Sequence, residues 1–297
     1  MLSLLTCAGM PTSLIYLPHR TVISLRGPDT IVLLERLVTN DTSDWPPGET
    51  RYGALLTPQG KVIADYLAWR TEDGVFLDVA RDHAPDLAKR LKLFRLRSQV
   101  EIAQHDDLMV FAGLTACDTA PDTPPEAEHA YRDPRYTDGR LRVLARADVA
   151  DETYTIADYH ADRIAHAVPE QGTDFGAADV FPAEINMDVL GGVALNKGCF
   201  VGQEVVSRMH RRGKIRKRTL RLEMPASATV QTGDSVSAPL SMGTVTSAAP
   251  GQALAVIRVD RLASAEQAGE TVTVNETPVS LEIPAWLATE RAAMEGT

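Results

Sequence analysis

Alternating apolar and polar positions predict an early β-strand, and helical spacing follows it directly. The run TVISLRG, residues 21–27, alternates as a strand with one buried face does. In residues 27–41 the apolar positions from Ile31 to Val38 fall on one helical face, and Asp29 stands where an N-cap would. This part of the chain therefore predicts a strand followed by a short amphipathic helix.

A hairpin and a second helix come next. Residues 51–70 contain two β-rich runs joined by Pro58-Gln59-Gly60, which predicts a hairpin, and residues 74–80 predict another strand. Residues 82–98 have helical spacing, with basic residues on one side. The apolar side of this helix is expected to carry Leu87, Leu91 and Phe94. The order of strand, helix, three strands and helix is typical of an α+β layer with helices on an antiparallel sheet.

In the second half of the chain, the composition and the spacing of apolar positions change twice. Residues 117–135 are rich in proline and acidic side chains, which predicts a linker, and a strand at 139–145 and a helix at 155–170 follow. After Arg218, short β-like runs separated by Gly, Pro and Asn recur at regular spacing. This spacing predicts a small antiparallel β-barrel, with a loose tail from residue 287.

We therefore expect an α+β protein of several parts. The predicted divisions are an N-terminal α+β region at 1–120, a middle region at 121–215, a C-terminal antiparallel β-barrel at 216–285 and a tail at 286–297. At 297 residues the chain is long enough to bury a large core in two or three packed units.

Composition and charge exclude several classes of protein. No apolar run reaches the roughly 18 residues of a membrane span, and the formal net charge of -10 repels nucleic acids and anionic membranes overall. Cys7, Cys117 and Cys199 are far apart and odd in number. That argues against a disulfide framework, a zinc site, or a complete iron–sulfur cluster held by this chain alone. We expect a protein of a reducing, cytoplasmic compartment with no membrane partner.

The strongest chemical signal is a cysteine in an unusual setting. Cys199 follows Lys197 and lies between Gly198 and Gly202, and residues 201–209 are spaced as a helix. A nearby cation and a helix N-terminus both favour the thiolate. A free cysteine is more often a small buried apolar side chain, which is how we interpret the other two cysteines. In this loop we favour a reactive thiol that takes a group or ligates a metal transiently, with no permanent metal site.

Three further residues complete the same run, and local chemistry alone leaves their roles open. They are Phe200, Gln203 and Glu204. Gln203 could be a surface amide or a hydrogen-bond donor within the loop. Glu204 could act as a base, accept a hydrogen bond or cap a helix start. We interpret Gln203 and Glu204 mainly as scaffold for the Cys199 loop.

The run from Lys197 to Glu204 resembles the K-G-C-[YF]-x-G-Q-E signature of the YgfZ family, folate-binding relatives of the glycine-cleavage T-protein. Similar segments are GPD at 27–29, TND at 39–41, LLTPQGKVIAD at 55–65, DPRYTDGR at 133–140 and residues 181–218. The resemblance implies a three-lobed, T-protein-like architecture and a tetrahydrofolate cofactor. It also implies assistance in assembling or repairing iron–sulfur clusters of client enzymes, including tRNA-modifying ones. Cys199 and Lys197 would be the catalytic candidates, and Cys199 would carry a cluster transiently.

A folate site needs a carboxylate for the donor N–H pair of the pterin and apolar walls around the ring. By resemblance, Glu184 lies where T-proteins keep a glutamate that grips the pterin. Asn186, Tyr52 and Arg208 are weaker candidates for the same cavity. Asp65 would also touch folate, although a polar position on an exposed strand face explains it equally well.

The resemblance to an enzyme is incomplete. T-proteins carry an Asp-Asp pair after the hairpin turn, and here Ala64 replaces one carboxylate while Asp65 remains. We therefore favour an assembly factor without turnover and leave open a folate-dependent aminomethyltransferase that would need Asp65. A second alternative is a passive folate- or RNA-binding module in which Cys199 is structural.

Two basic runs stand out in this acidic chain. The first extends from Arg208 to Arg221. The second contains Lys89, Arg90, Lys92, Arg95 and Arg97. Such runs suit the anionic glutamate tail of folate or a protein partner. Aromatic residues make up only 5% of the chain, so stacking surfaces for single-stranded RNA are not evident and RNA ranks lower as a partner.

Overall fold

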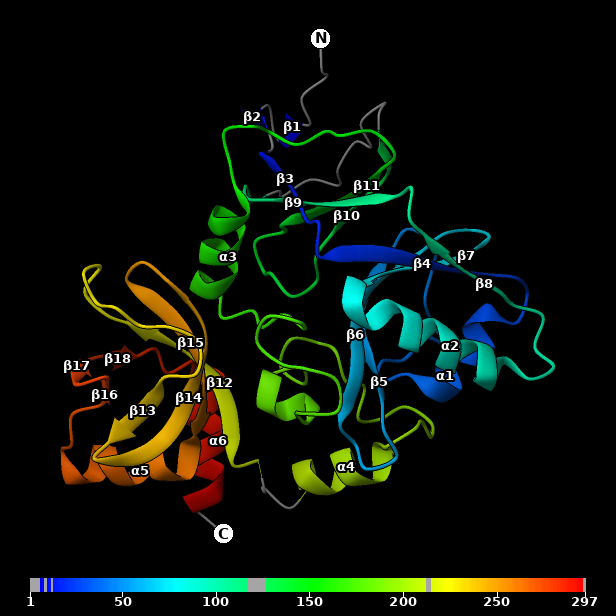
Figure 1. Ribbon diagram of the computed structural model, residues 1–297. Coiled ribbons are helices and arrows are strands. Elements are labelled where there is room, and N and C mark those ends of the chain that lie inside the picture. The colour runs from blue at the N-terminus through cyan, green and yellow to red at the C-terminus, as the bar shows by residue number, and fades with distance from the viewer. Residues whose placement is uncertain (1–5, 8–9, 12, 117–126, 212–214, 296–297) are drawn as a thin grey trace.

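The computed structural model describes residues 6–7, 10–11, 13–116, 127–211 and 215–295. Its elements form three parts around a common centre, and each part is built on its own sheet (Figure 1). Every pair of neighbouring strands in these sheets is antiparallel, as expected for the α+β class.

The first part is a five-stranded sheet in the order β5-β6-β7-β4-β8, with two helices on one face. Its elements are β4 (Arg20–Arg26), α1 (Thr30–Leu37), β5 (Thr50–Leu56), β6 (Val62–Arg70), β7 (Gly74–Ala80), η1 (Arg81–His83), α2 (Ala84–Arg95) and β8 (Glu101–His105). The predicted strands, hairpin and helices of this region are confirmed. Strand β8 was not anticipated, because its side chains are mostly exposed or half-buried and give a weak apolar pattern.

Two details of this part differ from expectation. Asp29 occupies the N-cap position of α1 without capping it, and its carboxylate instead accepts a hydrogen bond from the Gln99 amide at 2.7 Å. In α2, Leu87 and Leu91 are buried as predicted, but Phe94 is 41% exposed. The apolar side of α2 therefore extends past the edge of the core.

The second part is a four-stranded sheet in the order β10-β11-β9-β3, flanked by α3. Its elements are β3 (Leu14–Tyr16), β9 (Met109–Gly113), β10 (Ala127–Arg132), β11 (Leu141–Ala145) and α3 (Ile156–Ala165), with a small hairpin of β1 (Thr6–Cys7) and β2 (Met10–Pro11) before it. Strands from both sides of the predicted boundary at residue 120 pair in this sheet. The predicted linker also contains β10, while residues 117–126, including Cys117, lie outside the described part of the chain.

The third part is a seven-stranded barrel in the order β17-β16-β13-β14-β15-β12-β18. Its elements are β12 (Lys217–Glu223), β13 (Ser235–Ala238), β14 (Leu240–Ala249), β15 (Gln252–Arg258), α5 (Val259–Ala268), β16 (Thr273–Val274), β17 (Thr277–Pro278), β18 (Ser280–Leu281) and α6 (Ala285–Glu295). The expected loose tail is wrong. It forms α6, because Leu287 is fully buried in the barrel core and Trp286 packs against that core.

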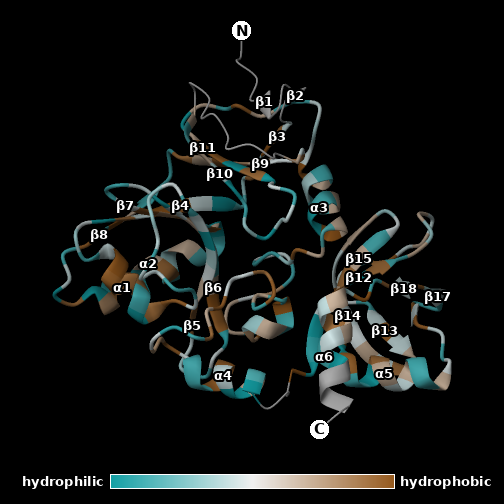
Figure 2. Cartoon of the chain, turned by 180° about the vertical axis from the view of Figure 1, so that it is seen from behind, coloured by the Kyte–Doolittle hydropathy of each residue, from teal (hydrophilic) through white to brown (hydrophobic). Residues whose placement is uncertain are grey.

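A long segment between α3 and β12 passes through the centre and carries η2 (Pro182–Ile185) and α4 (Gln203–Arg211). Figure 2 shows that α4 is mostly hydrophilic and lies at the edge of the molecule. Val206 alone is buried among the residues of this helix. The central segment therefore connects the three parts and ends in a polar surface helix.

Glu170, in this central segment, is a fully buried carboxylate that binds the first two parts together. Its oxygens accept a hydrogen bond from the Tyr159 hydroxyl at 2.7 Å and lie 3.1 Å from His19 Nε2 and 3.8 Å from an Arg20 guanidinium nitrogen. Burial would raise the pKa of Glu170, but the hydrogen bond to His19 and the nearby Arg20 charge outweigh it and hold that pKa well below its usual range.

Asp174, four residues later, reaches the barrel. One carboxylate oxygen accepts hydrogen bonds from the hydroxyls of Thr246 and Ser247, both at 2.7 Å. The other accepts from the Arg163 guanidinium at 2.6 Å. Glu170 and Asp174 thus connect all three parts through side chains that are almost entirely shielded from water.

A second buried connection joins α4, the central segment and the barrel. The Asp188 carboxylate accepts two hydrogen bonds from Arg218, at 2.7 and 3.0 Å, and pairs with His210 Nε2 at 3.2 Å. Arg218 also pairs with Glu290 of α6 at 2.9 Å. Burial would raise the pKa of Asp188, but hydrogen bonds from His210 and Arg218 outweigh it and lower the pKa to about 2.

We expect Asp188→Asn to reduce the free energy of unfolding at pH 7 by about 2 kcal/mol, because a pKa shift of that size corresponds to this energy. The lowered pKa means that the contribution is fully present above the unfolded value near pH 4 and is lost as pH falls towards 2. The variant should therefore lose less stability than the parent on acidification, as urea unfolding at pH 7 and pH 3.5 would measure.

Asp260→Asn is the matched control. The pKa of Asp260 is also about 2, but its pair with Arg258 is largely exposed, so solvent screens it. The control should change stability by less than about 0.5 kcal/mol. Equal losses in both variants would show that burial of the Asp188 pair contributes nothing.

Candidate functional site

Cys199 is an exposed, free cysteine in the loop that leads into α4. The helix begins at Gln203, four residues further along the chain. The thiol is therefore accessible to a partner or ligand, as a reactive or ligating cysteine requires. Cys7 lies in β1, and its side chain is outside what the structure describes.

Lys197 anchors this loop to the first part of the molecule. Its ammonium donates to the Val38 carbonyl at 3.1 Å and the Asn40 carbonyl at 2.7 Å, and it pairs with Glu35 of α1 at 3.3 Å. Burial lowers the pKa of Lys197, and the Glu35 carboxylate opposes that shift. Because these oxygens occupy the ammonium, the geometry gives Lys197 a positioning role and not the free cation beside the thiol that the sequence suggested.

Gly202 lets the loop approach the β5–β6 hairpin closely. Its φ is +80°, and a Cβ atom at this position would lie 2.6 Å from the Thr57 carbonyl oxygen. Gly198 differs, since a Cβ there would meet nothing within 4 Å and its φ is not in the left-handed region. The fold itself requires glycine at position 202 but not at position 198.

The remaining residues of the run divide between core and surface. Phe200 is buried in the central core, and its ring lies under the Lys197 ammonium at 5.5 Å. The Gln203 amide donates to the Lys197 carbonyl at 3.2 Å, which fixes the loop to the start of α4. Glu204 is largely exposed and forms an ion pair with Arg208 one turn later. Gln203 therefore contacts the loop, whereas the exposed Glu204 carboxylate pairs only along α4 among the described residues.

A hollow of about 600 Å³ lies beside this loop. One wall comes from Leu195 and Asn196, which precede the cysteine, and the other comes from α4. The α4 residues that line it are Gln203, Glu204, Ser207, His210 and Arg211. The hollow is open and most of its lining side chains carry polar groups, so it can receive a segment of another molecule next to the loop.

The five expected folate residues do not gather around one cavity. Tyr52 and Asp65 lie together in the core, where the Tyr52 hydroxyl donates to Asp65 Oδ2 at 3.0 Å. Burial raises the pKa of Asp65, although Arg20 and Arg135 act against it. Asp65 is 1% exposed, so the explanation from an exposed strand face is wrong. Its second oxygen, Oδ1, has no hydrogen-bond partner among the described residues.

Glu184 lies apart from these two residues, in η2 of the central segment. Its carboxylate accepts a hydrogen bond from the Phe181 amide at 2.9 Å and lies 3.8 Å from the Lys217 ammonium. This carboxylate therefore caps η2. To bind a pterin as well, the same Glu184 carboxylate would have to keep its hydrogen bond to the Phe181 amide and accept from the ring.

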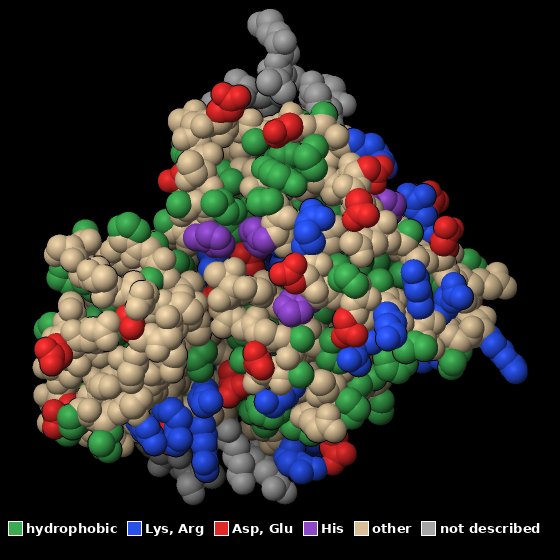
Figure 3. All heavy atoms as spheres, in the orientation of Figure 1, with side chains coloured by type: hydrophobic (Ala, Val, Ile, Leu, Met, Phe, Trp, Pro, Cys, Tyr) green, Lys and Arg blue, Asp and Glu red, His purple; other side chains and the backbone are tan. Residues whose placement is uncertain are grey.

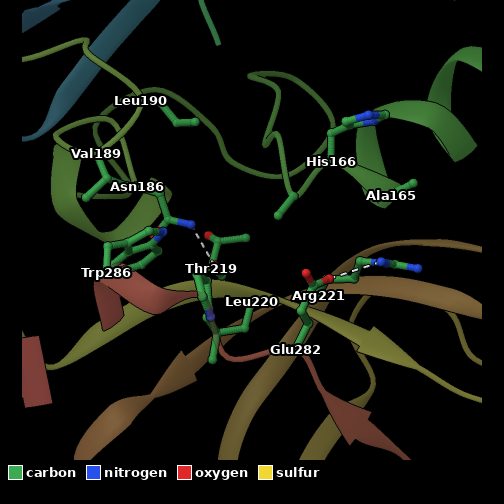
Figure 4. A pocket seen from close by; sticks show the side chains of 12 residues that line it. Ala165, His166, Asn186, Val189, Leu190, Thr219, Leu220, Arg221, Glu282 and Trp286 are labelled. Carbon is green, nitrogen blue, oxygen red and sulfur yellow. Dashed lines mark hydrogen bonds and ion pairs between the residues drawn. The ribbon is translucent and has the colours of Figure 1, made fainter. Parts of the chain in front are cut away.

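Asn186 lines a cavity of about 310 Å³ between the central segment and the barrel (Figure 4). Its amide nitrogen donates to the Thr219 carbonyl at 2.7 Å, while its buried Oδ1 has no partner in the described part of the chain. Figure 4 shows Trp286 on one side of this cavity and the Arg221–Glu282 ion pair on the other. The cavity thus combines an aromatic wall, an unpaired buried acceptor and a charged rim.

The first basic run is not one continuous patch. Arg218 is buried against Asp188, Arg221 pairs with Glu223 and Glu282, and Arg208 pairs with Glu204. Arg212 and Lys214 lie outside the described residues. Much of this run is therefore structural, and Arg208 lies on an exposed helix face away from the buried folate candidates.

Sequence reasoning missed the buried polar cluster near Glu170. Its members include Arg20, Asp78, Asp133, Arg142 and Arg163. Arg20 donates to Asp78 at 2.6 Å, and one nitrogen each of Arg20, Arg142 and Arg163 has no hydrogen-bond partner among the described residues. The available signal was a charged residue inside an otherwise apolar strand, as in GVFLDVA and LRVLA.

We expect Gly202→Ala to lower the free energy of unfolding by about 2 kcal/mol, because the added methyl group meets the Thr57 carbonyl and the φ is unfavourable. Gly198→Ala is the matched control and should change stability by less than about 0.5 kcal/mol, since its Cβ enters open space. Urea unfolding of both variants measures the difference. Equal effects would contradict the close contact between the loop and the hairpin.

Comparison with known proteins supports this architecture. The GCVT N-terminal domain matches residues 13–111, and the CAF17 C-terminal beta-barrel domain matches residues 216–289. The structure of glycine cleavage system aminomethyltransferase T from Bartonella henselae superposes with a TM-score of 0.69 at 14% identity, covering 94% of this chain and 86% of that one. This likeness shows the fold.

Among curated relatives, the iron-sulfur cluster assembly factor IBA57 homolog, mitochondrial, of Mycosarcoma maydis is 34% identical over 233 residues, which is 71% of this chain and 57% of that protein. The human iron-sulfur cluster assembly factor IBA57, mitochondrial, is 29% identical over 235 residues, 71% of this chain and 66% of that protein. The match thus spans between half and two thirds of each relative.

The names of both relatives place them in mitochondria, whereas the sequence led us to expect a cytoplasmic protein. Within the described residues, no helix is both long and apolar enough to cross a membrane. The chain is thus similar to the GCVT N-terminal domain in its first part and to the CAF17 C-terminal beta-barrel domain in its last, and it shares its fold with the aminomethyltransferase.

Proposed function

We propose that this protein is an iron–sulfur cluster assembly factor of the YgfZ type that offers Cys199 to a cluster or to a sulfur-bearing group. The observation that carries the proposal is an exposed thiol on a loop whose neighbours on both sides are firmly anchored. The relatives named as iron-sulfur cluster assembly factors support the same function.

The loop is built to present one side chain. Lys197 is fixed to α1 before the cysteine, and Phe200 is buried in the core directly after it. Gly202 then packs against the hairpin turn. Only Gly198 and Cys199 are exposed within this anchored stretch, so the thiol holds a defined position while remaining accessible.

One thiolate occupies one ligand position of an iron–sulfur cluster, which is usually held by four thiolates. The other ligands would come from an iron–sulfur assembly protein or a client enzyme, and the cluster would be cargo that passes through the shared site. The polar hollow beside the loop supports this role, because it leaves room for a partner segment next to Cys199. Clients would include tRNA-modifying enzymes.

We further propose that tetrahydrofolate binds at the Asn186 cavity. A volume of about 310 Å³ is at the lower end of the range for ligand pockets, about 300–1,000 Å³, and suits a bicyclic ring with its glutamate tail directed outwards. Trp286 would contact the ring face, and a ring N–H would supply the missing partner of Asn186 Oδ1. When bound, tetrahydrofolate would supply a carrier of one-carbon units.

The aminomethyltransferase alternative has less support. Asp65, the carboxylate it needs, is enclosed in the core and hydrogen-bonded to Tyr52. The RNA-binding alternative relied on the first basic run, and Arg218 within that run is buried in an ion-pair network.

We expect Cys199→Ser to fold normally, with an unchanged melting temperature, because the side chain is exposed. In cells that lack the parent gene, the variant should fail to restore the activity of cluster-dependent enzymes. Cys7→Ser is the matched control and should restore that activity in full. Full rescue by Cys199→Ser would remove the thiol from the function.

Calorimetric titration with tetrahydrofolate tests the cofactor proposal independently. Asn186→Gly tolerates the left-handed backbone at this position, where φ is 58°, and removes the acceptor, so we expect at least tenfold weaker binding. Glu184→Gln keeps an oxygen for the η2 cap and should bind nearly as well as the parent. The reverse pattern would move the ring to Glu184, and no measurable binding to the parent would exclude folate.

A further inference from the structure

The surface where α1 meets the C-terminal end of α2 exposes large apolar side chains. Leu96 is 85% exposed, Leu93 66%, Val32 58% and Phe94 41%. Scattered exposed apolar residues are ordinary, but here they adjoin, and a groove of about 670 Å³ runs between the two helices. We call this feature the α1/α2 groove and define it by Val32, Arg36, Phe94, Arg95, Leu96 and Arg97. Ser98 and Asp29 complete its lining, and the Asp29 carboxylate is hydrogen-bonded to the Gln99 amide.

The backbone holds Leu96 in this exposed position. Leu96 has φ 49° and ψ -108°, a conformation that suits glycine and disfavours leucine. The Asp29 carboxylate holds the Gln99 amide at 2.7 Å, and Arg95 donates to the Val100 carbonyl at 3.1 Å. A strained leucine, fixed by its neighbours and directed into water, indicates selection for contact with another molecule.

The rim of the groove is cationic, and its charges are available. Arg36, Arg95 and Arg97 line the groove, and Lys89 and Lys92 lie further along α2. Within the described residues, no carboxylate forms an ion pair with any of these five cations. Figure 3 shows Lys and Arg side chains grouped around hydrophobic ones over α1 and α2. Free cations concentrated at one place in a chain of net charge -10 attract an acidic molecule to that place and away from the rest of the surface.

We propose that the α1/α2 groove docks a segment of a partner protein in which Leu- or Phe-type anchors are flanked by Asp or Glu. Val32, Phe94 and Leu96 line a shallow, open groove between two helices, which suits contact with a few anchors along a helix or strand. An anionic membrane would face the same cations, but the acidic remainder of the molecule would oppose its approach.

The groove adjoins the Cys199 loop through α1. Arg36 lines the groove, and the preceding residue, Glu35, pairs with Lys197 at 3.3 Å. A segment docked here would place its protein beside the same helix that positions the thiol. Docking itself does not need the thiol, so Cys199→Ser should bind the segment as well as the parent does, whatever the outcome for the proposed function.

The test is selection from a displayed library of random 16-residue peptides on the full-length protein, with counter-selection against a Phe94→Ser/Leu96→Gly variant. We expect enriched peptides with apolar anchors flanked by acidic residues. A synthetic copy of the most enriched peptide should bind at least tenfold more weakly to Leu96→Gly and to Lys92→Glu/Arg97→Glu, and more weakly at 0.5 M NaCl than at 0.1 M.

Leu96→Gly should keep or raise the melting temperature, because glycine relieves the backbone conformation, so loss of binding would not reflect unfolding. Leu240→Ser is the matched control, since Leu240 is 75% exposed on the barrel, and it should bind the peptide normally. Three results would each overturn the proposal. They are no enrichment, enriched peptides that bind Leu96→Gly unchanged, and preferential binding of the groove to vesicles with 30% anionic lipid or to a second copy of the chain.

Discussion

Three parts with separate sheets form one molecule because two carboxylates are buried at their junction. Glu170 meets His19 and Arg20 from the first sheet region and Tyr159 from α3, and Asp174 meets Arg163 and the hydroxyls of β14. A buried carboxylate is costly unless it is paired, so removing any one partner leaves a charge without compensation. The relative placement of the parts is therefore fixed by hydrogen-bond geometry more strictly than apolar contact would fix it. The candidate site lies on the segment that starts from this junction and inherits its fixed position.

The segment from residue 166 to 211 carries the exposed thiol of Cys199 and is anchored to the rest of the molecule at several points. Asp188 ties its middle to Arg218 of the barrel, and Lys197 ties its end to α1. Cys199 lies between Lys197 and the buried Phe200, so the chain can expose the thiol while both of its flanks are held. The Lys197 ammonium donates hydrogen bonds to the backbone carbonyls of residues 38 and 40. Lys197 therefore positions the loop. The expectation that its charge favours the Cys199 thiolate relied on adjacency in sequence, whereas the ammonium is bound to backbone carbonyls.

The sequence was sufficient for much of the fold, because periodicity records burial. The hairpin at 51–70 and the helices at 82–98 and 155–170 follow from apolar spacing, and the glycine-rich run identified the Cys199 loop. What failed depended on contacts between distant residues. Leu287 lies in a helix because it fills the barrel core, and β10, which follows the Pro-rich stretch, forms because it pairs with β11. The exposed-face explanation for Asp65, which stood beside a contact with folate, failed because alternation within one strand does not reveal that both sides are covered.

The distribution of cations shows which charges maintain the fold and which remain available. Arg20, Arg142, Arg163 and Arg218 lie inside the molecule and each faces a carboxylate. These arginines lie where they neutralise buried carboxylates. The sequence alone does not distinguish them from arginines on the surface. The cations around Leu96 have no such task within the described residues, and the leucine they surround occupies a backbone conformation that glycine would adopt more easily. An acidic protein that keeps unpaired cations beside exposed apolar side chains retains features that its own folding does not require. The same distinction applies to Gly198, which no contact within the chain demands, next to the exposed sulfur of Cys199.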